Sequence, residues 1–419
     1  MNTMTYETLK GTSDLEPKDA IKINNVLNTL KKNFELFGFR PFDSPLIEFW
    51  DTLTMKYEED SEIVNEIFKV EDRGERKLGL RYDLTTPLCR YVSANPQLKK
   101  PFRRYHVGKV FRDGPLKKGR VREFYQCDAD VVGQDGQEIE AELLDLFSSS
   151  YKELGLDVVL ELNNNKILRG ALLSSGANEK ELSSYILSID KLKKIQIEGV
   201  LREVKDKKLN QDIAKKAIKI LSLKTLEELK NSSENILFQE GIEELRDLTK
   251  SILKLGVTFR LNFSLSRGLD IYTGNIWEAY DNTNTISSSL GSGGRYDKVI
   301  GEYANSSEII PAVGISFGLV PTIICLEEVS KVNTKEGITQ LLIVPLSIDC
   351  VTIAQEIAQK YRKEGKNTEV FYQYSMKKAF KYSDYLGVEE LIILGEKDID
   401  QKKYILKNLK SKEQEEILF

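Results

Sequence analysis

The arginines between residues 99 and 122 are the most informative chemical feature of this sequence. Ten Lys or Arg residues in that stretch stand against one acid, Asp113, whereas the whole 419-residue chain has a formal net charge of −4. Such a local concentration of positive charge in a mildly acidic protein predicts a focused anion site rather than a general nucleic-acid coat. Arginines on rigid strands can bind phosphate groups bidentately, so phosphate chemistry is our first expectation.

A β-hairpin is the element that we expect to position these arginines. Arg112 and Arg120 flank a loop that contains glycine and proline. Residues 102–111, before the loop, read as a strand, and apolar and polar residues alternate after it from Phe124 to Val131. This pattern predicts two antiparallel strands, with arginines at the end of the first and the start of the second.

The scarcity of histidine and the scattered cysteines disfavour several other kinds of chemistry. His106 is the only histidine, and alone it cannot form a zinc site or a Ser-His-Asp triad. The four cysteines lie far apart without a Cys-x-x-Cys pair, so we expect reduced, packed thiols rather than metal ligands or disulfides. Most hydrolase mechanisms are therefore disfavoured.

Length and hydropathy predict a cytoplasmic protein of two or three domains. The chain is longer than one hydrophobic core normally accommodates. No apolar run approaches the ~18 residues of a membrane-spanning helix. Met1–Asp19 lacks the apolar segment of a secretory signal.

Hydrophobic periodicity predicts an order of elements along the chain. Residues 166–255 are rich in Lys, Glu, Leu and Ser, and this composition predicts a run of helices. The glycines from Gly291 to Gly294 suggest a turn or a close backbone approach. Helices are expected at 21–37, 84–92, 133–154, 321–329, 351–363 and 375–386, and strands at 39–49, 79–82, 102–111, 158–162, 257–263, 270–280, 287–289, 313–317, 341–344, 368–372, 390–394 and 403–409.

Five short motifs in a fixed order resemble those of the class II aminoacyl-tRNA synthetases, and within that class the histidyl-tRNA synthetases. Lys10–Asp14 (KGTSD) resembles the family's KGTRD, and Gly38–Glu48 resembles its dimer-forming motif 1. Val110–Asp128 resembles motif 2. Arg267–Thr273 (RGLDIYT) is similar to the histidine-specific RGLDYYT signature, and Gly291–Asp297 (GSGGRYD) contains GGRYD of the family's GGGRYD.

The resemblance runs nearly end to end and implies an α+β fold. Its parts are a class II antiparallel sheet with helices, a helical insertion and a C-terminal α/β anticodon-binding domain. The implied boundaries are 1–165 and 256–329 for the two parts of the catalytic domain, 166–255 for the insertion, 330–340 for a linker and 341–419 for the anticodon-binding domain.

The resemblance also implies a reaction that needs no nucleophilic side chain. The carboxylate of histidine attacks the α-phosphorus of ATP, and the activated acyl group of histidyl-adenylate then passes to the 3′ end of tRNA(His). Positioning and electrostatic stabilisation carry such a step. By resemblance Arg112 and Arg267 are the catalytic residues, and the ATP-binding residues are Arg112, Arg120, Phe124, Gly294 and Arg295.

A small pocket of acids and acceptors is implied for histidine. Asp83 and Thr85 would bind its ammonium group, and Gln126 with Arg267 its carboxylate. Asp130 and Tyr272 would hold the two imidazole nitrogens, and Gly293 would let the backbone approach. Plainer roles stay open: a helix cap for Asp83, a structural hydrogen bond for Asp130, core packing for Phe124 and a turn for the glycines.

The remaining implications concern partners. The family uses Mg²⁺ with ATP, works as a homodimer and does not bind membranes; the Mg²⁺ ligands are not identifiable here. In the C-terminal domain Tyr372, Tyr374, Lys377, Lys378 and Lys381 suit stacking and phosphate contacts with single-stranded bases.

One position departs from the family pattern. Class II synthetases usually carry GLER at motif 3, whose arginine contacts the γ-phosphate of ATP, but this chain has GLVP, ending at Pro321. Another cation, such as Arg120 or Arg295, could replace it. The alternative is a noncatalytic histidine-binding paralogue, of the kind that regulates a phosphoribosyltransferase. A synthetase for proline, threonine or glycine is a third reading, which the RGLDIYT motif disfavours.

Overall fold

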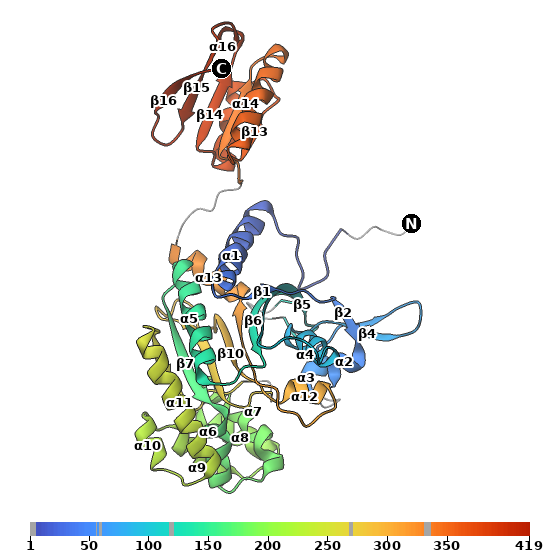
Figure 1. Ribbon diagram of the computed structural model, residues 1–419, viewed down its shortest axis with the longest axis vertical. Helices are drawn as coiled ribbons and strands as arrows, with labels where there is room; N and C mark the ends of the chain where they lie inside the picture. Colours follow the sequence, from blue (N-terminus) through green and yellow to red (C-terminus); the bar gives the residue numbers. More distant parts are fainter. Residues whose placement is uncertain (1–5, 56, 58–60, 117–120, 268–270, 331–336) are drawn as a thin grey trace. The chain divides into compact units, whose positions relative to one another are not determined.

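The computed structural model describes residues 6–55, 57, 61–116, 121–267, 271–330 and 337–419. The chain divides into two compact units (Figure 1). The first contains Val26–Ser330 with the N-terminal residues up to Ser13, and the second contains Lys331–Phe419 with Asp14–Asn25. Each unit has its own sheet and is described separately.

An eight-stranded sheet, mostly antiparallel, forms the body of the first unit (Figure 1). Only the edge pairs β1–β5 and β7–β8 are parallel. The predicted hairpin is confirmed, because β5 and β6 pair antiparallel over their full length. The strand order is β1 (Arg40–Pro41), β5 (Phe102–Phe111), β6 (Glu123–Val132), β11 (Ala312–Gly318), β10 (Gly291–Arg295), β9 (Asn275–Asp281), β7 (Val158–Asn164) and β8 (Phe259–Leu261).

Two amphipathic helices cover one face of this sheet. Phe34 of α1 (Pro17–Leu36) stacks on Tyr105 of β5 at 5.3 Å between ring centroids. Phe147 of α5 (Gln137–Glu153) meets Phe317 of β11 edge-on at 4.6 Å. Since side chains alternate between the two faces of a strand, the neighbours of Tyr105 and Phe317 in sequence point to the opposite face.

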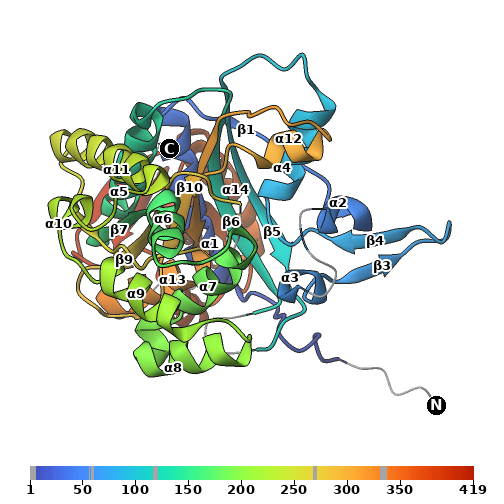
Figure 2. The ribbon, with the colours of Figure 1, turned by 90° about the horizontal axis from the view of Figure 1, so that it is seen from below.

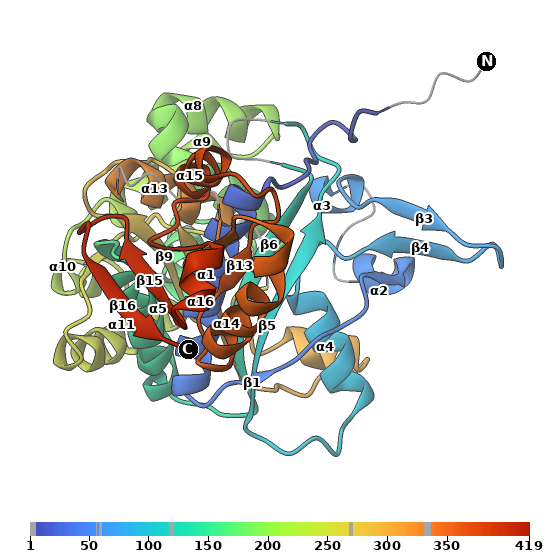
Figure 3. The same cartoon turned by 90° about the horizontal axis from the view of Figure 1, so that it is seen from above.

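Several short elements lie on the β5 side of the main sheet. A three-stranded antiparallel sheet extends away from the main sheet (Figures 2 and 3). Its strands are β2 (Ile47–Phe49), β4 (Lys77–Leu80) and β3 (Lys69–Glu71), so the predicted strand at 39–49 is interrupted between β1 and β2. The helices of this region are α2 (Trp50–Thr54), α3 (Glu62–Asn65), α4 (Thr85–Ala94) and α12 (Val299–Tyr303).

The Lys- and Leu-rich segment is helical, as its composition predicts. Its helices gather beside β7 and β9 (Figure 2). They are α6 (Asn165–Ser174), α7 (Leu182–Ile189), α8 (Leu192–Asp206), α9 (Gln211–Leu221), α10 (Leu226–Lys230) and α11 (Ile236–Lys254). We refer to α6–α11 as the insertion.

One prediction near residue 290 is wrong, since residues 287–289 form no strand. Of the two readings of the glycines, a turn or a close backbone approach, the structure shows the second, because Gly291–Arg295 is β10, paired on both sides. A methyl group at Gly293 would lie 2.2 Å from the Gly314 carbonyl oxygen and 2.6 Å from Trp277 Nε1. The glycine therefore serves close packing inside the sheet rather than chain reversal.

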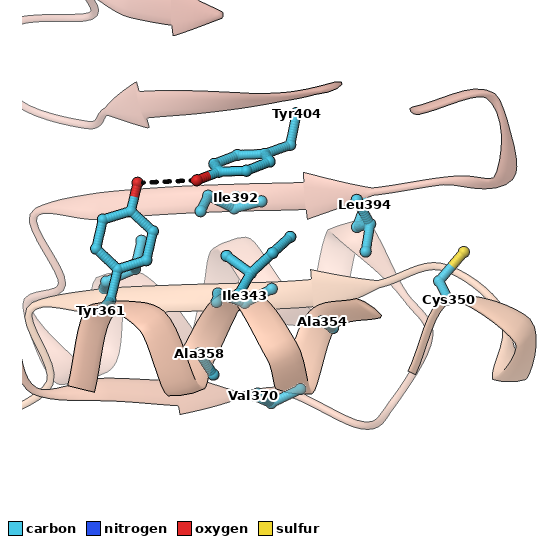
Figure 4. Close-up of a cluster of buried hydrophobic side chains, with 11 residues drawn as sticks. Ile343, Cys350, Ala354, Ala358, Tyr361, Val370, Ile392, Leu394 and Tyr404 are labelled. Atoms are coloured by element: carbon cyan, nitrogen blue, oxygen red, sulfur yellow. Dashed lines mark hydrogen bonds between the residues drawn. The ribbon is translucent and has the colours of Figure 1, made fainter. Parts of the chain in front are cut away.

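The second unit is an α/β domain around a five-stranded sheet. The two C-terminal strands were only partly predicted, since β16 was missed. Its core packs Ile343, Ala358, Ile392 and Tyr404 together, and the hydroxyls of Tyr361 and Tyr404 lie 3.4 Å apart (Figure 4). The strand order is β13 (Thr368–Val370), β12 (Leu341–Pro345), β14 (Glu390–Leu394), β15 (Lys403–Asn408) and β16 (Gln414–Leu418), and the helices are α14 (Val351–Lys363), α15 (Met376–Leu386) and α16 (Glu396–Asp400).

Candidate active site

Strand register places a row of polar side chains across the main sheet. Asp128 of β6 pairs with Ser316 of β11, Ser316 with Ser292 of β10, and Ser292 with Glu278 of β9. His106 of β5 extends the row on the other side of Asp128. Directly paired residues project from the same face, so these side chains share the face opposite α1 and α5. We call this surface the polar face.

The middle of the polar face is partly accessible although it belongs to central strands. Gln126, Ser316, Ser292 and Glu278 are half-buried, whereas the residues between them on the strands, such as Ile315, are buried under the helices. Their side chains are also small on β10 and β11. A strip of short polar side chains between larger ones leaves room for a ligand to lie on the sheet.

Arg112 stands at one end of this strip, directly after β5. Its backbone N–H donates to the Arg122 carbonyl oxygen at 2.9 Å, which closes the hairpin. The guanidinium carbon lies 4.3 Å from the Tyr82 ring centroid and 5.1 Å from that of Phe124. The base of the loop is held by the Arg122–Asp113 ion pair at 3.0 Å.

Residues 117–120 of this loop, including Arg120, lie outside the described residues. Phe124, predicted to stack on adenine, is half-buried on the polar face, with Arg112 near its ring. Its predicted partner would therefore stack on the other side of the ring.

Arg267 approaches the same face from the opposite side. Its Nη1 forms an ion pair with Glu278 of β9, while its Nε has no hydrogen-bond partner among the described residues. Burial is the largest influence and acts to lower the pKa of Arg267, but Glu278, Tyr272 and Asp190 together outweigh it and the pKa is raised. Residues 268–270, which continue the predicted signature, are not described.

Arg112 and Arg267 thus flank the strip. Arg112 lies against Phe124 of β6, and Arg267 against Glu278 of β9, with β11 and β10 between those strands. Three strand spacings correspond to about 14 Å across the sheet, and Phe124 lies four residues, about 13 Å, along β6 from Asp128, which shares the row of Glu278.

Asp130 is held by two protein groups at the buried end of the polar face. Its Oδ2 lies 2.8 Å from Arg104 Nη2, and its Oδ1 accepts a hydrogen bond from Tyr296. A methyl group at Gly314, its cross-strand neighbour, would lie 2.0 Å from Oδ1. Burial raises the pKa of Asp130, although the Arg104 charge opposes this.

Tyr272 lies within electrostatic reach of Arg267 and of the acids on the polar face. Burial raises the pKa of its phenol, Arg267 opposes this, and the charges of Asp128 and Asp130 add to it. A methyl group at Gly294 would lie 2.7 Å from Tyr272 Cδ1, so the glycine permits this close approach. The structure therefore brings Tyr272 and Asp130, the two predicted imidazole ligands, to one region.

Asp83 and Thr85 lie where β4 leads into α4. The buried Asp83 accepts a hydrogen bond from the Thr86 N–H at 2.8 Å, as a helix cap does. Thr85 is half-buried at the first position of the helix. Arg104 Nη2 donates to the Leu84 carbonyl oxygen at 3.1 Å, which joins this turn to the polar face.

Several buried polar atoms of the polar face lack a hydrogen-bond partner among the described residues. They are Gln126 Oε1, Asp128 Oδ1, His106 Nδ1, Arg104 Nε and Nη1, and Arg267 Nε. Buried polar groups are nearly always hydrogen-bonded, so such a cluster marks a surface built for a polar ligand.

The sequence reasoning missed Arg104 and Asp128. Burial raises the pKa of Asp128 to about 7, while burial with the nearby Arg104 and Arg81 charges lowers that of His106 to about 3. The spacing of Gln126, Asp128 and Asp130 could have identified Asp128, because every second residue of a strand shares a face. Arg104 gives no such signal apart from its place in β5.

Arg295 and Gly293 point to the helix-covered face. Arg295 Nε pairs with Glu140 of α5, its Nη2 donates to the Gly136 carbonyl oxygen at 2.8 Å, and its Nη1 lies 3.3 Å from Asp297. Every nitrogen of this guanidinium has a protein acceptor on the side away from the strip. The predicted ATP contact of Arg295 finds no support in this geometry.

Pro321 lies in the first turn of α13 (Leu319–Ser330), which contains no Lys or Arg. No group of three or more His, Cys, Asp or Glu side chains in the described ranges is arranged to hold a metal ion. Within the same ranges, no helix has the length and apolar character needed to cross a membrane.

In the second unit an exposed surface carries the predicted tyrosines and lysines. Tyr372 is 49% exposed and Tyr374 is 41% exposed, both between β13 and α15. Lys377, Lys378 and Lys381 are exposed on α15. Aromatic rings beside mobile cations suit the stacking of bases and contacts with phosphate groups.

Comparisons with known proteins agree with the motifs. Residues 11–321 match the model of the histidyl-tRNA synthetase family, and residues 340–419 match that of an anticodon-binding domain. The chain is 34% identical over 418 residues to histidine–tRNA ligase 1 of Bacillus cereus (strain ATCC 10987 / NRS 248), covering 97% of this chain and 94% of that one. It is also 34% identical to histidine–tRNA ligase 2 of Shouchella clausii (strain KSM-K16), covering all of both chains.

A solved structure shares the fold. The histidyl-tRNA synthetase of Nostoc sp. PCC 7120 superposes with a TM-score of 0.86 at 27% identity, covering 99% of this chain and 97% of that one.

Proposed function

The chain belongs to the histidyl-tRNA synthetase family, and from this premise we propose how its polar face activates histidine. It is an aminoacyl-tRNA synthetase, a histidine–tRNA ligase. A histidine carboxylate oxygen attacks the α-phosphorus of ATP and pyrophosphate leaves; the acyl group of histidyl-adenylate then passes to a hydroxyl at the 3′ end of tRNA, and AMP leaves.

The placement of Arg112 and Arg267 on one face is the observation that carries this mechanism. Negative charge builds up on the α-phosphate as the carboxylate attacks, and two guanidinium groups flanking the strip would stabilise it. Arg112 is held by the hairpin and by Tyr82, and Arg267 by Glu278, so neither has to reorganise during the step. Holding both reactants in register lowers the barrier without a protein nucleophile.

The histidine pocket is proposed to lie beside Asp130 and Tyr272. The Asp130 carboxylate and the Tyr272 phenol would face the two imidazole nitrogens, while Arg104 and Tyr296 fix the orientation of the carboxylate. An amino acid without these polar atoms would leave buried groups unpaired, which is a large penalty. The ammonium group would bind at Asp83 and Thr85, and Gln126 with Arg267 would bind the carboxylate. Gly293 would act only through the backbone of β10.

For ATP we propose that adenine stacks on Phe124, that Arg112 binds the α-phosphate and that Gly294 keeps the strip clear. Arg120, outside the described residues, remains our proposal for an outer phosphate in place of the missing motif 3 arginine. Mg²⁺ usually binds one or two carboxylates together with substrate phosphates. Because the described residues offer no metal cluster, we propose that the ATP phosphates hold it, and no step is assigned to it.

We further propose a cytoplasmic homodimer that charges tRNA(His). Leu46 and Ile47 are each 47% exposed and Phe49 is 57% exposed, next to Pro45 and the edge strand β1. A run of exposed apolar side chains at a sheet edge favours association with a second copy.

The functional division that we propose along the chain follows the motifs. It has a catalytic domain in two parts, 1–165 and 256–329, an insertion at 166–255, a linker at 330–340 and an anticodon-binding domain at 341–419. Tyr372 and Tyr374 would stack on anticodon bases.

Histidine-dependent exchange of pyrophosphate into ATP tests the mechanism. Arg112→Gln or Arg267→Gln should each lower the exchange rate by about 10²–10³. Arg76→Gln is the matched control, since Arg76 is an exposed arginine that pairs with Asp72 on the three-stranded sheet. If the wild-type protein shows no exchange at high concentration, the proposed function is wrong.

The noncatalytic paralogue is not favoured. The curated relatives named as histidine–tRNA ligases span the whole chain, and an anticodon-binding domain matches its end. Pro321 remains the one feature in its favour.

A further inference from the structure

The corner between α7 and α8 of the insertion makes two contacts with residues outside the insertion. Asp190 closes α7, and Lys193 lies in the first turn of α8. Asp190 Oδ1 accepts a hydrogen bond from Ser266 Oγ at 2.9 Å, and Lys193 Nζ lies 2.6 Å from Glu161 of β7. The first contact reaches the residue before the proposed catalytic Arg267, and the second reaches the cross-strand neighbour of Glu278, which pairs with Arg267.

The first contact fixes the residue that precedes Arg267. The Ser266 side chain is buried, with the residue only 2% exposed, so its hydroxyl needs the partner that Asp190 supplies. The charge of the same carboxylate also acts to raise the pKa of Arg267. Asp190 therefore constrains both the backbone before Arg267 and the electrostatic environment of its guanidinium.

The second contact supports the carboxylate that binds Arg267. Glu161 and Glu278 are cross-strand neighbours on β7 and β9, and like charges in such a pair repel each other. Lys193 and Arg260 neutralise Glu161, and the Lys193 ammonium lies 5.1 Å from the Tyr280 ring centroid.

Tyr280 completes the connection. Its hydroxyl donates to Glu278 Oε2, while Glu278 Oε1 binds Arg267. A continuous series of contacts thus runs from Lys193 through Tyr280 and Glu278 to the guanidinium of Arg267.

We propose that Asp190 and Lys193 are positioning residues for adenylate formation: through Ser266 and through Glu161, Tyr280 and Glu278, they hold Arg267 where the α-phosphate is attacked. The inference rests on the proposed function of the polar face. It gives the insertion a part in the first chemical step, in which no tRNA takes part. Neither residue touches the substrates.

The backbone of α8 is divided into two segments. Gln196, three residues after Lys193, has φ 58° and ψ 176°, which interrupts the helix. Beyond it, Gly199, Val200 and Val204 are buried in the insertion. The segment of α8 before Gln196, which contains Lys193, is therefore distinct from the segment that packs within the insertion.

The test measures histidine-dependent pyrophosphate exchange in full-length Asp190→Asn and Lys193→Met. Misplacement of a catalytic group by about 1 Å can cost up to ~10²-fold, so we expect kcat to fall by about 10- to 100-fold. The KM for histidine should rise as well, because Arg267 is also proposed to bind the histidine carboxylate, whereas the melting temperature should stay close to that of the wild type. Lys193→Arg, which keeps the charge at Glu161, should restore most of the rate.

Lys191→Met is the matched control. Lys191 belongs to the same corner but pairs with Glu203 inside the insertion, at 2.8 Å. Its substitution should therefore leave the exchange rate unchanged. A double variant of Lys193→Met with Tyr280→Phe should lose less than the product of the two single losses, since both act through Glu278. If the wild type shows exchange but Asp190→Asn and Lys193→Met exchange at the same rate as Lys191→Met, this inference is wrong and the proposed function stands. If the wild type shows no exchange, the proposed function itself is wrong.

Discussion

Gly314→Ala tests the geometry of the histidine pocket through a single added carbon. The new methyl group would lie 2.0 Å from Asp130 Oδ1, whereas real contacts of this kind are essentially never under 3.0 Å. The carboxylate must therefore move by about 1 Å or more, because the carbonyl oxygen of Ala129, 3.2 Å from the same position, closes the other side. That movement breaks the Tyr296 hydrogen bond and lengthens the 2.8 Å contact with Arg104.

The cost follows from burial. Arg104 is fully buried, and breaking a buried ion pair typically costs about 3–5 kcal/mol, so we expect a loss of stability of about 2–4 kcal/mol after local relaxation. Losing one charge-assisted hydrogen bond to imidazole is worth about 1.5–3 kcal/mol, which corresponds to a roughly 10- to 100-fold higher KM for histidine. The KM for ATP should change little.

Urea denaturation and exchange kinetics at varied histidine concentration measure both effects. Gly74→Ala is the control, since its methyl group would meet no atom closer than 3.4 Å, and it should match the wild type. A Gly314→Ala protein with wild-type stability and wild-type KM for histidine would refute the placement of Asp130 against β11.

Three further predictions address other parts of the molecule. The folded protein should hold a proton on Asp128 up to about pH 7, where the unfolded chain has released it near its ordinary pKa of 3.8. The contribution of Asp128 to the free energy of unfolding is therefore complete below about pH 4 and falls by up to about 4 kcal/mol as the pH rises toward 7. Urea denaturation measured against pH should show this decrease, and Asp128→Asn should remove it. Arg295→Met should destabilise the first unit by about 3–5 kcal/mol without raising the KM for ATP, because it leaves Glu140 buried without its cation; thermal melting with exchange kinetics checks this, and a raised KM at unchanged stability would speak for an ATP contact. Tyr372→Ala with Tyr374→Ala should weaken tRNA charging by about 10- to 100-fold and leave pyrophosphate exchange intact, and equal loss in both assays would place the tyrosines elsewhere.

Local pattern was sufficient for most elements of this fold. The strand at 102–111 and the helix at 351–363 have the predicted bounds, because apolar periodicity and the flanking turn residues agree there. The sequence left the glycines of 291–295 open between a turn and a close backbone approach, because they pack against Trp277 and Gly314 on neighbouring strands and a single stretch of sequence does not reveal such neighbours.

The site was only partly readable for the same reason. Motif order located Arg112 and Arg267, and the structure places both on one face. Arg295 belongs to a motif as well, yet the period of the strand turns it toward Glu140. Asp190 and Lys193 lie in the insertion, far along the chain from the motifs, so only the folded structure reveals their contacts with the site.

A double-mutant cycle on adenylate formation tests the central claim, that Arg112 and Arg267 act on the same phosphate. Single-turnover formation of histidyl-adenylate would be measured for the wild type, Arg112→Gln, Arg267→Gln and the double variant. Since groups that act as a unit on one transition state are strongly non-additive, the double variant should lose far less than the product of the two single losses. Losses that multiply fully would mean that the two arginines act independently, and absence of histidyl-adenylate in the wild type would contradict the account as a whole.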